Sequence, residues 1–388
     1  MKPALVSRMQ PYATSIFAEM SILAAETGAI NLGQGFPDTD GPEEMKEAAR
    51  AAITEGRGNQ YPPVHGLPEL RLAIAEHQQR FYGLTVDPMT DVVVTTGATE
   101  AIQSVILAFC ERDDEVVVFE PWFDIYATGI ALAGATRVSV PLRPPAFRPD
   151  IDALRDAITD RTRLLIVNSP HNPTGVVFTR EELQGIADIA IERDLIVLSD
   201  EVYEHLWYDG HPHIPIATLP GMAERTITLG SAGKSFSFTG WKVGWATGPT
   251  ALIQAVRSIR QHLSFVSGGP FQHAIAHGLR MSDSYYEDFR HGLQAQRDLF
   301  TSGVRELGFT ATESQGTYFL TTDLGPMADY PDALAAARDL PRRAGVVAIP
   351  QQALCDHAGV GDQALRWAYC KRPQVLMEAL DRLRSLCA

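Results

Sequence analysis

The stretch Ser231–Trp245, SAGKSFSFTGWKVGW, places one lysine, Lys234, among glycines and small hydroxyl side chains. It directly follows the apolar run RTITLGS at 225–231, which is typical of a strand. A second lysine, Lys242, comes eight positions later. A lysine that only faces solvent needs no such small loop. We therefore interpret Lys234 as a reactive lysine, whose neutral amine attacks a carbonyl carbon.

The order of strand followed by loop or helix recurs through the middle of the chain. Further apolar runs of strand length occupy residues 91–97, 114–121, 162–170 and 195–201. Helical patterns occupy residues 98–109, 122–134 and 179–194, the last beginning with a capping box of Thr179 and Glu182. Short strands separated by helices indicate a mostly parallel sheet with helices on both faces. We predict an α/β architecture.

The two ends of the chain have a different pattern. The N-terminal arm contains one helical segment, and from about residue 284 a long helical pattern gives way to short strands and a final helix. We predict a large domain at 32–283 with a mostly parallel mixed sheet. A smaller α+β domain would combine residues 1–31 with residues 284–388.

Composition restricts the possible partners. The 388-residue chain has a net charge of −14, which disfavours a nucleic-acid partner because phosphate binding needs a basic surface. No apolar run approaches the ~20 residues of a membrane helix. Four cysteines lack metal-type spacing, which indicates reduced thiols and no metal site: Cys110, Cys355, Cys370 and Cys387. We expect a soluble cytoplasmic protein with no membrane partner.

Ligands of such sheets bind at the carboxyl ends of the strands, so the residues directly after each strand are the candidates for binding. Gly97, Ala98 and Thr99 open a helix, whose free N–H groups favour a phosphate, although taken alone this signal is weak because a helix cap at Thr99 explains it. Asn172 lies in NSPHNPTG, which could also be an ordinary loop because Asn-Pro and Gly form turns.

An acid and an amine lie after the next two strands. Asp200 lies near the end of the run at 195–201, where a buried carboxylate needs a partner, although taken by itself it is better explained as a helix N-cap. Lys234 comes after the run at 225–231. A phosphate site, an acid and a reactive amine together describe one ligand. A Schiff-base lysine with an aspartate on a pyridinium nitrogen is the pattern of pyridoxal phosphate enzymes.

Here the sequence resembles a known family. NPTG at 172–175, then Asp200 with Tyr203, then the Ser231–Trp245 stretch, resemble the class I aminotransferases among the fold-type I pyridoxal phosphate enzymes. The 34-residue step from Asp200 to Lys234 also matches that family.

The resemblance runs from about Asn31 to the C-terminus and indicates one branch of the family. INLGQGFPD at 30–38 and NQYPP at 59–63 are similar to kynurenine and glutamine transaminases and cysteine-conjugate β-lyases. Bacterial methionine aminotransferases and N-succinyl-diaminopimelate aminotransferases belong to the same group. Many relatives carry an arginine at the position of Lys242, so the charge is kept here while a bidentate contact is lost.

The resemblance implies roles around pyridoxal 5'-phosphate. Lys234 would form the Schiff base and move the substrate proton, and Asp200 would pair with the ring nitrogen. The remaining implied cofactor contacts are Asn172 and Tyr203 on the phenolate oxygen, Phe123 on the ring face, and Gly97, Ala98, Thr99, Ser231, Lys242 and Tyr61 of the partner subunit at the phosphate.

The resemblance also implies a substrate site in a homodimer that shares its active sites. Arg366 would bind the α-carboxylate, helped by Gly35 and Asn172. Aromatic side chains would surround the substrate: Tyr12, Tyr61, Phe123 and Phe265. Such a wall suits a methionine, glutamine, aromatic or guanidino-type donor better than aspartate, with a 2-oxo acid as acceptor.

Two interpretations of the chemistry stay open at this point. The first is a ping-pong aminotransferase that exchanges an amino group between an amino acid and a 2-oxo acid; the second is a C–S β-lyase on the same scaffold. A nicotinamide dehydrogenase is disfavoured because no GxGxxG opens a strand-turn-helix unit. Without the resemblance, Phe123 would be interpreted as core and Arg366 as a structural ion pair.

Overall fold

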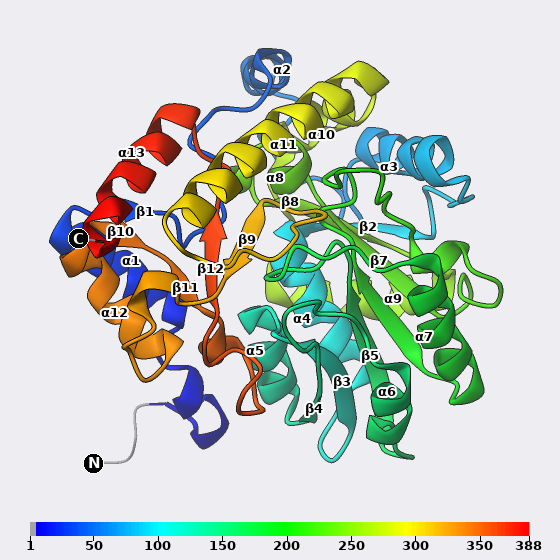
Figure 1. The fold of residues 1–388 in the computed structure, drawn as a ribbon. Coiled ribbons are helices and arrows are strands. Elements are labelled where there is room, and N and C mark those ends of the chain that lie inside the picture. Colours follow the sequence, from blue (N-terminus) through cyan, green and yellow to red (C-terminus); the bar gives the residue numbers. More distant parts are fainter. Residues whose placement is uncertain (1–4, 388) are drawn as a thin grey trace.

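The computed structural model describes residues 5–387, so the first four residues of the predicted arm and residue 388 lie outside the described residues. A seven-stranded sheet in the order β2-β8-β7-β6-β5-β3-β4 forms its centre (Figure 1). Its strands are β2 (Val92–Thr96), β3 (Glu115–Glu120), β4 (Thr136–Pro141), β5 (Thr162–Asn168), β6 (Ile196–Asp200), β7 (Thr226–Ser231) and β8 (Val243–Thr247). Within this sheet β8 alone runs opposite to the other strands, which confirms the predicted mostly parallel, mixed α/β sheet.

Two strands of this sheet were not among the predicted ones. β8 begins at Val243, inside the stretch that we interpreted as a loop around Lys234. β4 lies at one edge of the sheet, and its sequence TRVSVP alternates polar and apolar residues instead of forming a continuous apolar run. A strand at the edge of a sheet can be polar on one face, so it lacks the continuous apolar run by which the other strands were predicted.

Helices cover both faces of the sheet, because alternate strand residues point to opposite sides. Val116 and Val118 of β3 pack in the core beneath α4 and α5, whereas Val117 and Phe119 pack beneath α6 and α7. A third core lies under α2, α3 and α10. The covering helices are α2 (Glu43–Thr54), α3 (Pro68–Tyr82), α4 (Gly97–Phe109), α5 (Asp124–Ala133), α6 (Ile151–Ala157), α7 (Arg180–Glu192), α9 (Thr250–Leu263) and α10 (Gly269–Leu279). The predicted capping box of Thr179 and Glu182 begins α7.

The first and last parts of the chain lie side by side, as the blue and the orange-to-red segments of Figure 1 show. The parallel pairing of β1 with β10 joins them, and β9, β12 and β11 form a separate antiparallel sheet. The division at residues 283 and 284 falls where α11 begins and stays a prediction. The elements are α1 (Ile16–Thr27), β1 (Ile30–Asn31), α11 (Asp283–Glu306), β9 (Phe319–Thr322), α12 (Ala333–Arg343), β10 (Val346–Val347), β11 (Ile349–Pro350), β12 (Leu365–Ala368) and α13 (Pro373–Leu383).

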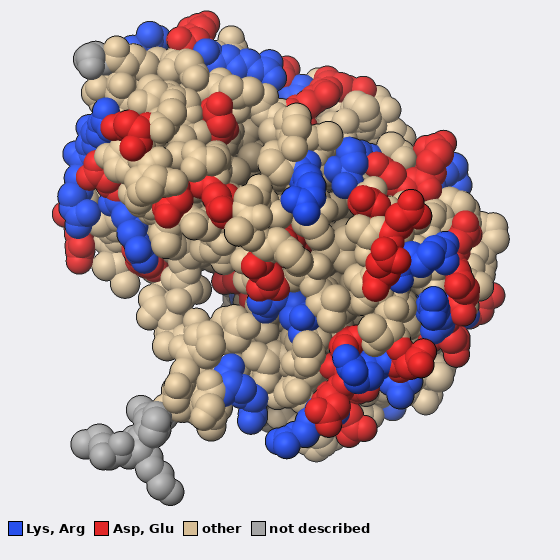
Figure 2. Space-filling model, turned by 60° about the horizontal axis from the view of Figure 1, so that its bottom comes forward, with Lys and Arg blue, Asp and Glu red and all other residues tan. Residues whose placement is uncertain are grey.

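The surface carries both signs of charge. On the face shown in Figure 2, lysine and arginine side chains are interspersed with aspartate and glutamate side chains. Among residues 5–387, no helix combines the length with the apolar composition that a membrane span needs.

Candidate active site

A cavity of about 600 Å³ opens at the carboxyl ends of the central strands. Asn168 at the end of β5 pairs in register with Asp200 at the end of β6, so side chains directly after these strands converge on one place. Twelve predicted site residues line the cavity: Gly35, Gly97, Ala98, Thr99, Phe123, Asn172, Asp200, Tyr203, Ser231, Lys234, Lys242 and Arg366.

Lys234 lies on the short helix α8 (Ala232–Ser235), directly after β7. Its Nζ donates a hydrogen bond to the Tyr318 hydroxyl at 2.8 Å and lies 3.5 Å from the Gly35 carbonyl oxygen. Burial of the amine lowers the pKa of Lys234 to about 8, although the neighbouring Asp200 charge opposes this shift. The amine is therefore far easier to deprotonate near neutral pH than an exposed lysine.

Asp200 ends β6 and is 3% exposed. The Tyr126 hydroxyl donates to its Oδ2 at 2.5 Å. Burial raises the pKa of Asp200, and the hydrogen bond from Tyr126 opposes that rise. A buried carboxylate held in this way is a strong partner for a cationic nitrogen that enters the cavity.

Arg366 on β12 is 2% exposed and forms no ion pair within the described residues. Its guanidinium donates to Asn172 Oδ1 at 3.0 Å and to the Gly33 carbonyl at 2.5 Å, whereas its Nε has no hydrogen-bond partner. The guanidinium lies 4.1 Å from the Phe319 ring centre and 4.8 Å from that of Phe17. Burial lowers the pKa of Arg366 only to about 10, so it remains a cation that needs an anion.

A second anion site lies at the start of α4. Gly97 has a φ of 70°, and a Cβ there would lie 3.2 Å from Lys242 Nζ, so glycine leaves room for that cation. Lys242 itself adopts a left-handed backbone, with a φ of 52°, and its Nζ donates to Thr99 Oγ1 at 3.3 Å. Free N–H groups at a helix start beside an ammonium group suit a phosphate.

Tyr12 does not line this cavity in the described chain. Its hydroxyl accepts a hydrogen bond from Arg137 at 3.1 Å in a separate hollow that Asp356 also lines. Phe17, on the first turn of α1, lines the cavity instead. The arm therefore supplies an aromatic ring to the site, but from a position five residues later than the one we predicted.

Tyr61 and Phe265 also lie outside the cavity of a single chain. Their rings meet edge to face, with centroids 5.5 Å apart, and the two residues are 80% and 44% exposed. Among the predicted aromatic residues of the substrate wall, Phe123 alone lines the cavity of the described chain.

Among the contributors to the site that were not recognised in the sequence are Phe17, Tyr126 and Tyr318. Tyr126 lies in a helical pattern and Tyr318 precedes a short strand, and both positions are equally typical of core tyrosines. Hydrogen bonds to Asp200 and Lys234 distinguish these two tyrosines, and such contacts exist only after the chain has folded.

Comparison with known proteins identifies the family. The model named "Aminotransferase class I and II" matches residues 27–383. The probable N-succinyldiaminopimelate aminotransferase DapC of Mycobacterium tuberculosis is 50% identical, with 98% of both chains covered. The chain therefore belongs to the class I and II aminotransferases, which are in general pyridoxal phosphate-dependent, and it is an enzyme that transfers amino groups.

Within that family the relatives fall in the predicted branch. The solved structure of N-succinyldiaminopimelate aminotransferase from Mycobacterium tuberculosis superposes with a TM-score of 0.96 at 51% identity, covering 99% of this chain and 100% of that one. The methionine aminotransferase of Escherichia coli is 35% identical, with 98% of both chains covered. Kynurenine–oxoglutarate transaminases are among the further relatives. The fold-type I assignment is thereby confirmed.

A substitution at Gly35 tests how tightly the cavity wall is packed. A Cβ at this position would lie 2.4 Å from Cζ of Phe319, the ring that covers Arg366. We expect Gly35→Ala to lower the free energy of unfolding by about 1–3 kcal/mol, because overpacking forces neighbouring rings to move. Urea unfolding measures the effect. Gly292→Ala is the control, because that helical position is open and the change should stabilise the protein by about 0.5–1 kcal/mol. Equal effects of the two variants would contradict the predicted packing.

Proposed function

We propose that this enzyme uses pyridoxal 5'-phosphate to transfer the amino group of a long-chain L-amino acid to a 2-oxo acid, with N-succinyl-diaminopimelate as its preferred donor. One observation carries the proposal: Lys234 lines the same cavity as Arg366, a buried arginine whose Nε has no hydrogen-bond partner. The transfer needs an amine that can lose its proton near neutral pH, which Lys234 supplies. Holding an α-carboxylate needs a cation, which Arg366 supplies.

The residues present fit the cofactor. The start of α4 with Lys242 would hold its phosphate, and Asp200 would hold its ring nitrogen as a cation. Phe123 would contact the ring, and Asn172 and Tyr203 its phenolate oxygen. When bound, pyridoxal phosphate supplies an electron sink for the bonds at the substrate α-carbon.

The chain's own residues would then handle charge and protons. Arg366 has a free Nε and no carboxylate partner within the described chain, so it can bind and orient the α-carboxylate. Lys234, as a neutral amine, would remove the proton from the substrate α-carbon and return it during transfer. Asp200, whose Oδ2 accepts a hydrogen bond from the Tyr126 hydroxyl, would offer its carboxylate to the ring nitrogen.

The cations of the cavity bear on the choice of donor. Within the described part of one chain, the cavity-lining cations are Lys234, Lys242 and Arg366, and each already has a proposed role. A short donor such as aspartate would need a further cation deep in the cavity for its side-chain carboxylate. A long donor can place a neutral amide inside and its distal carboxylate near the mouth. The name of the 50% identical relative supports the acylated diaminopimelate as that donor.

We also propose a homodimer with shared active sites, working in the cytoplasm. The exposed pair of Tyr61 and Phe265 supports an interface there, because the two rings are in contact and adjoining exposed apolar side chains mark sites of protein–protein contact. The four cysteines are all free, which suits a reducing compartment.

The role of Lys234 is tested by its removal. Lys234→Ala should bind no cofactor covalently and lose at least ~100-fold in turnover, the usual contribution of a positioned acid–base group. Borohydride treatment of the wild type should fix the cofactor to the peptide that contains Lys234, as mass spectrometry of the digest would reveal. Lys46→Ala is the control and should behave as wild type, because this lysine of α2 pairs with Asp40 and Glu43 away from the cavity. Cofactor found on another peptide would reject the assignment.

The shared site is tested by mixing inactive subunits. If Tyr61 acts in the site of the partner subunit, a hybrid of Lys234→Ala and Tyr61→Ala subunits contains one intact site. Random exchange should then restore about a quarter of wild-type activity, since half of the dimers are hybrids with one working site each. Activity assays after subunit exchange measure the recovery. An enzyme that is fully active as a monomer in light scattering would contradict the proposal.

Donor choice is tested with a panel of N-succinyl-diaminopimelate, methionine, glutamine, kynurenine and aspartate, each with 2-oxoglutarate or pyruvate as acceptor. We expect the specificity constant for N-succinyl-diaminopimelate to exceed that for aspartate by roughly 10–200-fold, the scale of a missing pocket contact. Formation of the new amino acid, measured by chromatography, gives the rates. Aspartate as the best donor would mean that an overlooked cation lies in the site.

A further inference from the structure

Tyr318 connects the reactive lysine to the substrate-binding loop. Its buried hydroxyl accepts a hydrogen bond from Lys234 Nζ at 2.8 Å and donates one to the Gly35 carbonyl oxygen at 2.6 Å. A tyrosine hydroxyl carries one proton, and the carbonyl oxygen can only accept. The proton of Tyr318 is thus committed to Gly35, so its oxygen can only accept from Lys234.

We propose that Tyr318 is a positioning residue for Lys234: it holds the amine by one N–H and leaves the nitrogen lone pair free to face the substrate. This inference rests on the proposed role of Lys234. An acceptor at this point fixes the amine without using the electron pair that must take up the substrate proton. A donor in the same place would occupy that pair and block the reaction.

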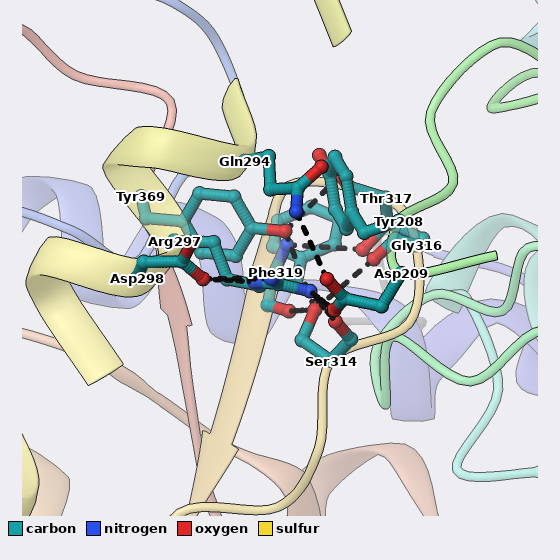
Figure 3. Close-up of polar contacts among 10 residues, drawn as sticks. All are labelled: Tyr208, Asp209, Gln294, Arg297, Asp298, Ser314, Gly316, Thr317, Phe319 and Tyr369. Atoms are coloured by element: carbon teal, nitrogen blue, oxygen red, sulfur yellow. Dashed lines mark hydrogen bonds and ion pairs between the residues drawn. The ribbon is translucent and has the colours of Figure 1, made fainter. Parts of the chain in front are cut away.

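The backbone before Tyr318 is strained and is held in place. Thr317 has a φ of 66°, which is rare for a β-branched residue and costs on the order of 1–3 kcal/mol. Its carbonyl oxygen accepts hydrogen bonds from the hydroxyls of Tyr208, at 2.5 Å, and Tyr369, at 3.2 Å (Figure 3). Its own hydroxyl accepts the N–H of Phe319 at 3.0 Å. Because several hydrogen bonds maintain this strained backbone, we infer that it serves to direct the side chain of the next residue, Tyr318.

Arg297 anchors the same loop from the far side. It extends from α11 and donates to the Ser314 carbonyl at 2.9 Å and to Asp209 at 2.5 Å (Figure 3). Gln294, one turn earlier on α11, also donates to Asp209, at 2.9 Å. Through Arg297, the loop that carries Tyr318 is therefore joined both to α11 and to the segment that contains Asp209.

Several charged and titratable groups face Lys234, and Tyr318 differs from the charged ones in staying neutral. Burial raises the pKa of Tyr318 well above its ordinary value. The facing groups come from different elements: Asp200 of β6, Arg366 of β12, Lys242 before β8, Cys370 after β12, and the rings of Tyr203 and Tyr318. Tyr318 therefore acts through its hydrogen bond, whereas Asp200, Arg366 and Lys242 act through their charge.

The direct test is the titration of Lys234 in the full-length, cofactor-free chain. Trinitrobenzenesulfonate labels neutral amines, and mass spectrometry of the Lys234 peptide measures its labelling rate against pH. The wild-type midpoint should lie at about 8. An accepted hydrogen bond favours the ammonium form over the amine, so Tyr318→Phe, which removes the acceptor, should move the midpoint about one pH unit lower.

Tyr208→Phe is the matched control. It removes one hydroxyl that holds the same loop, but that hydroxyl bonds Thr317 and not Lys234. We expect its labelling midpoint to stay at the wild-type value. The proposal is overturned if Tyr318→Phe leaves the midpoint unchanged, or if Tyr208→Phe moves it equally. Should Tyr318→Phe fail to fold, 3-fluorotyrosine at position 318 keeps the shape and weakens the acceptor, and it should also lower the midpoint.

The cofactor-loaded enzyme gives a second readout. Tyr318→Phe should lower kcat about 10–100-fold, the scale of a misplaced reacting group, while KM for the donor changes less than about threefold. A change in KM alone would overturn the proposal, because it would assign Tyr318 to substrate binding through Gly35. Failure of every donor with the wild-type enzyme would reject the proposed function, whereas the labelling midpoints would still decide the contact between Tyr318 and Lys234.

Discussion

The constraint on which the rest of this structure depends is that two cations, the partly buried Lys234 and the buried Arg366, share one cavity. Removing an ammonium or a guanidinium from water costs on the order of several kcal/mol for each ion. Lys234 responds by a lowered pKa and can become neutral, whereas Arg366 cannot. The arginine is instead held by two acceptors and two aromatic rings, and keeps one nitrogen unpaired within the described chain. That arrangement favours an anion that enters the cavity.

The parallel sheet explains how distant residues reach this cavity. Its strands end along one edge, so a residue just after β5 and another just after β7 become neighbours despite the helix between them. Asp200 and Lys234 are separated by 34 positions in the chain, yet they line one wall. The apolar cores on both faces hold the strands in register, and small polar loops carry the chemistry.

The other wall of the cavity comes from the two ends of the chain. β12 supplies Arg366, the loop after β1 supplies Gly35, and the pairing of β1 with β10 keeps these segments together. Hydrogen bonds then cross from one part to the other, from Lys234 to Tyr318 and from Tyr318 to Gly35. The position of the reactive amine therefore depends on packing between segments far apart in the chain, since Tyr318 and Gly35 differ by 283 positions.

The amino-acid sequence alone was sufficient for five of the seven strands of the central sheet, the family and twelve residues of the cavity, because each of these depends on local signals. Apolar runs specify strands, and short motifs at their ends, such as the one around Lys234, specify chemistry. The strands β4 and β8 escaped prediction because one is a half-polar edge strand and the other lies within a motif that looks like a loop. The choice of Phe17 over Tyr12, and the contacts of Tyr126 and Tyr318, depend on which face of a helix or loop turns inward. Packing between segments far apart in the chain decides which face turns inward, and the residues next to each position in the sequence do not show it.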